Sequence, residues 1–240
     1  MENEESAQKL GRPMGTYITL ACEQAMTVSL ETRRALAAEL AQTLCGMLPP
    51  DMKTALVVGL GNRSVTPDSL GPRTAERVLV TRHMVRSLPR QFRGFTPVSA
   101  LAPGVLAATG MEALELLRGA VQATGCAAVI AVDALAARSR ERLCATVQLG
   151  DTGLIPGSGV GNHRKAIDKT TLGVPVVAVG VPTVIAAHLL GDGQPEDDPL
   201  FLTPRDIDGK VRELGRVIGY GVTLALQEGL SVEDVTGLLG

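Results

Sequence analysis

Residues 54–61 read TALVVGLG, an apolar run that stops at glycine. Such a run predicts a buried strand followed by a tight turn. Similar runs occur at 126–133 (CAAVIAVD), 143–150 (LCATVQLG) and 174–181 (VPVVAVGV), and weaker strand patterns occur at 15–20 (GTYITL) and 95–101 (FTPVSAL). The four stronger runs are continuous rather than alternating, which is typical of parallel strands that helices cover on both faces.

Helical patterns lie between these runs. Apolar residues spaced by three and four predict a helix over 30–47, and we expect further helices over 67–85 and 109–123. A last long helix is expected to begin with Thr203 as its N-cap, followed by Pro204 at the first helical position. The alternation predicts an α/β fold, a doubly wound and mostly parallel sheet with helices on both faces. We expect a single domain over 15–240, a disordered segment over 1–14, and a surface insertion over 191–199.

Composition excludes several classes of function. The 240 residues carry a net charge of −2, only 2% are aromatic, and none is Trp. A nucleic-acid surface needs exposed aromatic rings or a long basic track, so we expect no direct nucleic-acid partner. The most basic stretch, residues 82–93, is interpreted as a solvated helix face rather than a patch for an acidic partner.

The cysteines and the N-terminus indicate the cytoplasm. Four cysteines form no Cys-x-x-Cys pair, and Cys126 and Cys144 lie in apolar runs as buried thiols. The opening MENEESAQKL is acidic and lacks the pattern of a signal peptide, and no apolar run is long enough to span a membrane.

Polar residues follow the predicted strands. Ligands of doubly wound sheets bind beyond the carboxyl ends of the strands, which places Asn62, Asp68, Asp133 and Asp151 near one edge. Taken alone, Asp133 is a cap or turn residue and Asp68 a charge that stabilises its own helix. Taken together, a partly desolvated Asp133 and an Asp68 kept ionised by a helix N-terminus would share one proton. Such a pair can activate water against a peptide carbonyl.

The tripeptide Asp151-Thr152-Gly153 resembles the catalytic motif of pepsin-like proteases. Those enzymes bring two copies together in an all-β fold, whereas this chain has one copy and an α/β pattern. We therefore interpret Asp151 as a structural or supporting residue. The glycines that follow, Gly157 and Gly159, imitate a phosphate loop or form a flexible rim for a substrate. His163 is interpreted as a solvent-exposed or hydrogen-bonding residue rather than a metal ligand.

Longer motifs resemble the germination protease family of spore endopeptidases. The resemblance runs from LGRPMGTYITL almost to the C-terminus and includes VVGLGNRSVTPDSLGPRTAERVLVTRH, SALAPGVLAATGMEALELLRG, AVDALAARSRERL and TVQLGDTGLIPGSGVGNHRK. It implies an atypical aspartic endopeptidase without a cofactor that degrades small acid-soluble spore proteins in the spore core during germination. The catalytic pair of the family corresponds to Asp68 and Asp133, and Asn62, Asp151, Gly157 and Gly159 would support it. The resemblance also implies a tetramer.

The resemblance also concerns activation. Family members are made as zymogens and usually begin with several tens of residues more, including the pro-segment. This chain opens shortly before GTYITL, so the sequence shows no pro-segment whose removal would activate it.

Two alternatives stay open at this point. The sheet and its GLGN turn also resemble, more weakly, hydrogenase maturation proteases, in which two acids and a histidine bind nickel. Asp68, Asp133 and His163 occur in that order. The other alternative is a catalytically silent relative that binds spore proteins.

Overall fold

The computed structural model describes residues 13–21, 29–161, 164–191 and 200–240. One sheet of seven strands runs through it, in the order β1-β5-β6-β4-β2-β3, with β7 paired to β6. The strands are β1 (Tyr17–Ala21), β2 (Ala55–Gly59), β3 (Val98–Leu101), β4 (Ala128–Ala137), β5 (Thr146–Gly150), β6 (Val176–Ala186) and β7 (Phe201–Leu202).

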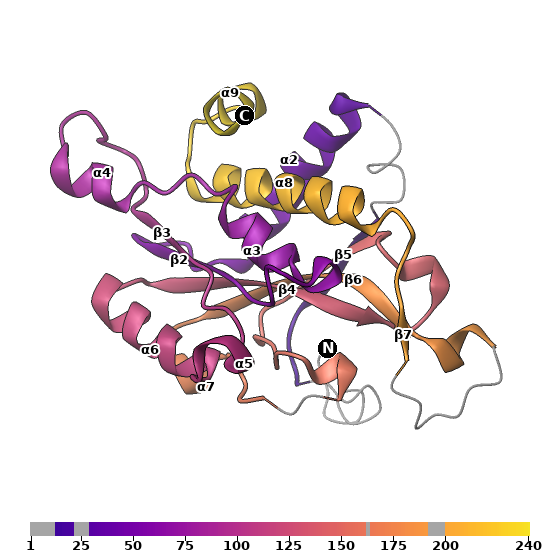
Figure 1. Ribbon diagram of the computed structural model, residues 1–240. Helices are drawn as coiled ribbons and strands as arrows, with labels where there is room; N and C mark the ends of the chain where they lie inside the picture. Colours follow the sequence, from indigo (N-terminus) through magenta and orange to yellow (C-terminus); the bar gives the residue numbers. More distant parts are fainter. Residues whose placement is uncertain (1–12, 22–28, 162–163, 192–199) are drawn as a thin grey trace.

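Helices cover both faces of this sheet (Figure 1). On one face lie α2 (Leu30–Met47), α3 (Leu70–Ala75), α8 (Ile207–Leu226) and α9 (Val232–Leu239), and on the other lie α5 (Leu106–Thr109), α6 (Ala113–Thr124) and α7 (Lys169–Leu172). The remaining helix α4 (Arg82–Ser87) projects at one end, and short 3₁₀ turns are η2 (Thr66–Asp68), η3 (Arg140–Arg142), η4 (Ser158–Val160) and η5 (Ala187–Leu190). The α/β prediction with two helical layers is confirmed.

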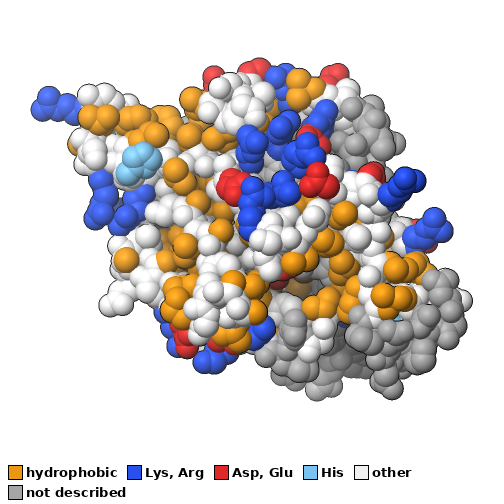
Figure 2. Space-filling model, in the orientation of Figure 1, with side chains coloured by type: hydrophobic (Ala, Val, Ile, Leu, Met, Phe, Trp, Pro, Cys, Tyr) orange, Lys and Arg blue, Asp and Glu red, His pale blue; other side chains and the backbone are white. Residues whose placement is uncertain are grey.

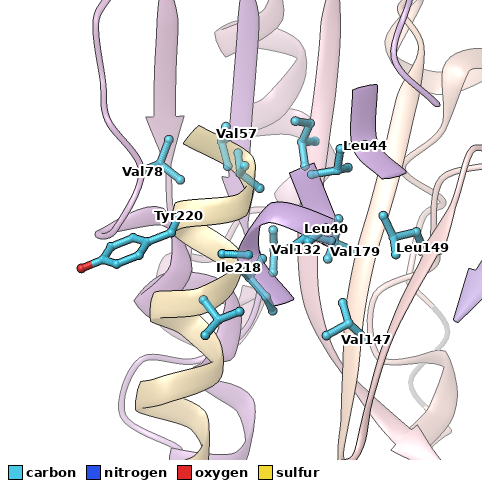
Figure 3. Packing of buried hydrophobic residues seen from close by; sticks show 14 of the residues in the cluster. Leu40, Leu44, Val57, Val78, Val132, Val147, Leu149, Val179, Ile218 and Tyr220 are labelled. Atoms are coloured by element: carbon cyan, nitrogen blue, oxygen red, sulfur yellow. The ribbon is translucent and has the colours of Figure 1, made fainter. Parts of the chain in front are cut away.

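Alternate residues of each central strand face different helical layers. Ile130 and Val132 of β4 belong to a cluster with α2 and α8, whereas Val129 and Ala131 belong to a cluster with α6. Figure 3 shows Leu40 and Ile218 beside Val132. Because both faces are buried, these strands need apolar residues at every position, which explains the continuous runs.

The central strands β3, β2, β4 and β6 are parallel, whereas β5 is antiparallel to β6, β1 to β5, and β7 to β6. The connection from β4 to β5 explains the reversal, because residues 138–145 form only a short turn with η3. A crossover between parallel strands needs about a dozen residues or more. The carboxyl end of β5 therefore lies at the edge of the sheet opposite to that of β4.

Three predicted element boundaries were wrong. The helix expected over 67–85 is divided into η2, α3 and α4, because the intervening chain bonds to other elements: Leu79 N–H donates to Thr223 Oγ1 of α8. The helix expected over 109–123 begins only at Ala113, because Gly110, with a φ of 71°, ends the preceding helix α5 at Thr109. Thr203 does not cap α8, since its hydroxyl donates to the Thr183 carbonyl at 2.8 Å and the helix begins at Ile207.

Two predicted segments lie outside the description. Of the segment 1–14, which was expected to be disordered, only residues 13 and 14 are described. Of the insertion expected over 191–199, only Gly191 is described. Among the described residues, no helix is long and apolar enough to cross a bilayer.

Candidate active site

The turn after β2 folds Asp68 back onto the end of its own strand. Gly61 has a φ of 110°, and a β-carbon there would overlap the Asp68 carbonyl oxygen, so only glycine fits without strain. The Asn62 N–H donates to Asp68 Oδ2 at 2.6 Å. The Asn62 side chain accepts from Ser64 N–H at 2.9 Å, which fixes the turn. The backbone N–H of Asn62 therefore bonds to the Asp68 carboxylate, while the Asn62 side chain stabilises the loop.

A close contact between α3 and the sheet brings this turn to β4. A β-carbon on Gly71 would overlap the Leu60 backbone and lie 2.5 Å from the Val132 carbonyl oxygen. The Leu60 N–H donates to the same Val132 carbonyl at 2.8 Å. Asp133 is the next residue of β4, so these contacts place the η2 carboxyl beside the β4 carboxyl.

Asp133 is almost fully buried, with 5% of its surface exposed. Its pKa is raised from 3.8 to about 7, chiefly by burial and in addition by the negative charge of Asp68, while the hydrogen bond from Ala134 N–H opposes both. Burial also raises the pKa of Asp68, against the hydrogen bond from Asn62. Near neutral pH, two carboxyl groups this close favour holding one proton between them, with Asp133 as its principal holder.

The sequence suggested that Asp133 ends its strand, but in the structure it does not. β4 continues to Ala137, and Asp133 pairs with Gly180 of β6. The neighbouring strand β2 ends at Gly59, opposite Val132. Asp133 is therefore the first residue of β4 beyond the carboxyl end of β2, which leaves its side chain at the edge where ligands of such sheets bind.

Both carboxyl groups line a cleft of about 830 Å³. Its walls come from the turn after β2, the segment 104–107, the N-terminus of α6, the far half of β4, and the loop after β5. Arg138 and Arg142, both exposed, and Lys165 also line the cleft, whereas Arg164 forms an ion pair with Glu112 at 3.5 Å. The cleft thus combines an acidic centre with a basic rim.

The two glycines expected at a substrate rim do line this cleft. Gly157 has a φ of 70° and is the N-cap of η4. Gly159 packs on β4, since a β-carbon there would lie 2.8 Å from the β-carbon of Ala136. Their role in binding stays a prediction.

Asp151 does not join the other acids, and its expected position near them was wrong. It follows β5, whose antiparallel direction carries it away from the edge where Asp133 lies. It does not line the cleft, and its Oδ1 accepts from Thr16 N–H at 2.8 Å. The nearby Thr152 hydroxyl bonds to Tyr17. The Asp-Thr-Gly tripeptide therefore anchors the start of β1.

Several lining residues were not singled out from sequence. Thr183 is buried and lines the cleft. It is the extra residue of a β-bulge in β6, because Leu135 pairs with Pro182 and the next residue of β4, Ala136, pairs with Val184. Such bulges often occur beside active sites, where they redirect a side chain. A lone polar residue in the apolar run around it was the available signal. Arg138 follows β4 directly, but nothing in the sequence distinguishes it from a solvated arginine.

Of the three residues proposed for a nickel site, the structure describes Asp68 and Asp133 but not His163. Among the described residues, no group of three or more His, Cys, Asp and Glu side chains is arranged to hold a metal ion. His163 lies outside those residues, so its expected hydrogen-bonding role and its place in a nickel site both stay predictions.

Comparison with known proteins gives consistent results. A sequence model of the germination proteases matches residues 1–193. A germination protease of Caldanaerobacter subterraneus is 36% identical in an alignment covering 99% of this chain and 86% of that protein. One of Clostridium tetani is 33% identical, with the same coverage. One of Priestia megaterium is 46% identical over 89% of this chain and 56% of that protein.

Among solved structures, the [NiFe] hydrogenase maturation protease HycI of Thermococcus kodakarensis aligns with 75% of this chain and 98% of its own. The TM-score is 0.44 and the identity 19%.

The fold, the cleft and these relatives define the chain as a peptidase of the α/β class. It belongs to the germination protease family.

Proposed function

We propose that the chain is an aspartate-dependent endopeptidase that degrades small acid-soluble spore proteins in the spore core during germination. Family membership supports the peptidase class and the connection with germination. One observation carries the mechanism: Asp68 and Asp133 come from different elements into one open cleft, where burial and the charge of Asp68 raise the pKa of Asp133.

The roles follow from the surroundings of each carboxyl group. Asp68 is the less buried of the two and accepts the Asn62 N–H, so it is the ionised member and takes a proton from water. Asp133 holds its proton and donates a hydrogen bond to the carbonyl oxygen of the scissile peptide. Attack by the water oxygen forms a tetrahedral intermediate. Asp68 then gives the proton that it took from water to the leaving nitrogen, and the C–N bond breaks to release an amine and a carboxylic acid.

Substitution of each acid tests the pair. We expect Asp68→Asn and Asp133→Asn each to slow cleavage of a purified small acid-soluble spore protein by about 10²–10⁴-fold, the usual contribution of an acid–base group. The rate is measured by gel or mass spectrometry. Asp151→Asn is the matched control: its amide oxygen can still accept the Thr16 N–H, so it should keep the wild-type rate and lose at most about 1 kcal/mol of stability with the charge. A large loss of rate in Asp151→Asn, with the wild-type rate in the other two, would contradict the assignment.

The same assay separates the two alternatives. Cleavage that chelators leave unchanged supports the aspartate mechanism. Stoichiometric nickel that is lost in His163→Ala, with chelator-sensitive cleavage, would indicate a metal-dependent peptidase instead. Binding without cleavage by the wild-type chain would indicate a catalytically silent relative.

A further inference from the structure

The far half of β4 has one free edge. β2 ends opposite Val132, whereas β4 continues to Ala137 with β6 paired along its other side. On the β2 side, residues 133–137 therefore run beside no strand of the part of the chain that the structure describes. The space that a longer β2 would have filled is part of the cleft, which Ala134, Leu135 and Ala136 line.

The backbone groups that face this edge follow from the hydrogen bonds of β4. The Val132 carbonyl accepts from Leu60, toward β2, whereas the Val129 N–H donates to Pro175, toward β6. Because these directions alternate along a strand, Ala134 and Ala136 present their N–H and C=O groups to the free edge. The Ala134 N–H already donates to Asp133 Oδ1 at 2.9 Å. The Ala134 carbonyl and both groups of Ala136 remain, and no residue in the described part of the chain bonds to them across this edge.

An open edge of this kind is a template for another chain, and proteins normally protect it. Here it lies in a cleft, between the carboxyl pair at one end and Arg138 at the other. The Asp133 carboxyl turns toward the same edge, because it accepts the Ala134 N–H. A peptide added as a strand would run about 4.8 Å from β4 and pass directly beside this carboxyl group.

We propose that the free edge of β4, Ala134 to Ala136, binds the substrate as an added β-strand and thereby lays its main chain across the two carboxyl groups. The occupant is an extended, unfolded segment of the substrate protein, held by main-chain hydrogen bonds to the Ala134 carbonyl and the Ala136 N–H and C=O. This inference rests on the proposed function and deepens it, because it assigns the peptide-binding surface of the same site. It also requires that the cleaved segment be unfolded, since only an extended chain can pair with a strand edge.

A series of N-methylated peptides tests this binding mode. Ten-residue peptides that tile a small acid-soluble spore protein are screened for binding to the Asp133→Asn variant by fluorescence anisotropy. The tightest is then synthesised with one backbone N–H methylated at a time. Successive N–H groups of a strand point to opposite sides, so we expect affinity to fall about tenfold at alternate positions near the scissile bond and to stay unchanged between them. Either direction of the added strand gives this period of two.

Substitution in the enzyme provides the second measurement. Ala136→Pro removes the N–H at the free edge without removing a bond to β6, and we expect it to weaken binding of the parent peptide about tenfold. The comparison variant Ala136→Ser changes the side chain but keeps the N–H, so it should weaken binding much less than Ala136→Pro does. Circular dichroism checks that both are folded, and the peptide series decides alone if Ala136→Pro is not.

The outcomes separate this inference from the proposed function. Cleavage of the parent peptide by the wild-type chain, with no alternation across the methylated series, overturns strand addition and leaves the peptidase intact. Alternation in binding to Asp133→Asn, with no cleavage of the parent peptide by the wild-type chain, supports strand addition and overturns the peptidase. If no tiling peptide binds, strand addition is overturned.

Discussion

Asp133 is held in its protonated form by two effects of unequal size. Burial in the sheet is the larger, and the charge of Asp68 adds to it. Each carboxyl group accepts one backbone N–H, but Asp68 is only partly buried, so its carboxylate is better stabilised than that of Asp133. The sequence suggested the same order but attributed it to the N-terminus of a long helix. The structure instead places Asp68 in a 3₁₀ turn, where one backbone N–H stabilises its charge.

The raised pKa of Asp133 predicts how stability depends on pH. The folded state binds its proton up to about pH 7, whereas the unfolded chain releases it near 3.8. Between these values the folded state holds more protons, so stability falls as pH rises, and the loss is complete above pH 7. The shift corresponds to a loss on the order of 4 kcal/mol at most. Asp133→Asn cannot ionise and should lack most of this slope in urea unfolding measured from pH 4.5 to 8.

The dependence of stability on pH is compared between the wild-type chain and Asp133→Asn. Parallel profiles for the wild-type chain and Asp133→Asn would mean that Asp133 titrates normally. The same pKa predicts that peptidase activity declines as pH rises through about 7, because the proton donor of the pair is lost.

At the level of elements, the site depends on the contact of α3 with β2 and β4. Gly71 lies against the backbone of Leu60 and Val132, with no room for a β-carbon. This contact fixes the distance between the turn that carries Asp68 and the strand that carries Asp133.

Charged side chains gather on the surface over α3 and α8 (Figure 2), where Asp208 forms ion pairs with Arg73 and Arg212. Such exposed pairs contribute little stability, typically below about 1 kcal/mol each.

Gly71→Ala tests the importance of this contact. The added carbon meets backbone atoms that cannot move aside, so we expect a loss of about 1–3 kcal/mol or more in urea unfolding, together with lower peptidase activity. Gly119→Ala is the matched control, because Gly119 lies within α6 and a β-carbon there meets nothing within 4 Å. It should gain about 0.5–1 kcal/mol. Equal stability of the two variants would contradict the packing argument.

At the level of the whole molecule, the described cleft residues come from several segments spread along the chain between Leu60 and Thr203. They meet because parallel strands direct their carboxyl ends to one edge of the sheet. The projecting basic segment lies apart from this edge: His83, Arg86, Arg90 and Arg93 are exposed on α4 and the loop after it (Figure 1). That exposure agrees with a solvated face.

The family resemblance predicts the state of assembly. If the chain forms the tetramer implied for this family, light scattering after size-exclusion chromatography should give four times its mass of 25.0 kDa, or about 100 kDa. A dilution series serves as the control, since a weak assembly would dissociate and a stable one would not. A mass of 25.0 kDa at all concentrations would contradict the prediction.

The sequence by itself determined the α/β class and the position of most central strands. Continuous apolar runs such as residues 54–61 and 126–133 are enough for this, because they reflect burial on both faces of each strand. The long motifs also determined the family. The sequence further identified the two acids that the cleft brings together, although their catalytic role stays a prediction.

Only the tertiary structure decided which polar residues share the site. Asp68 and Asp133 meet because β2 ends early, β4 continues, and Gly71 allows α3 to approach both strands. Asp151 is excluded because β5 is antiparallel, and the direction of a strand depends on its partner rather than on its own residues. For the same reason, the bulge at Thr183 and the free edge of Ala134 to Ala136 appear only once the strands are paired.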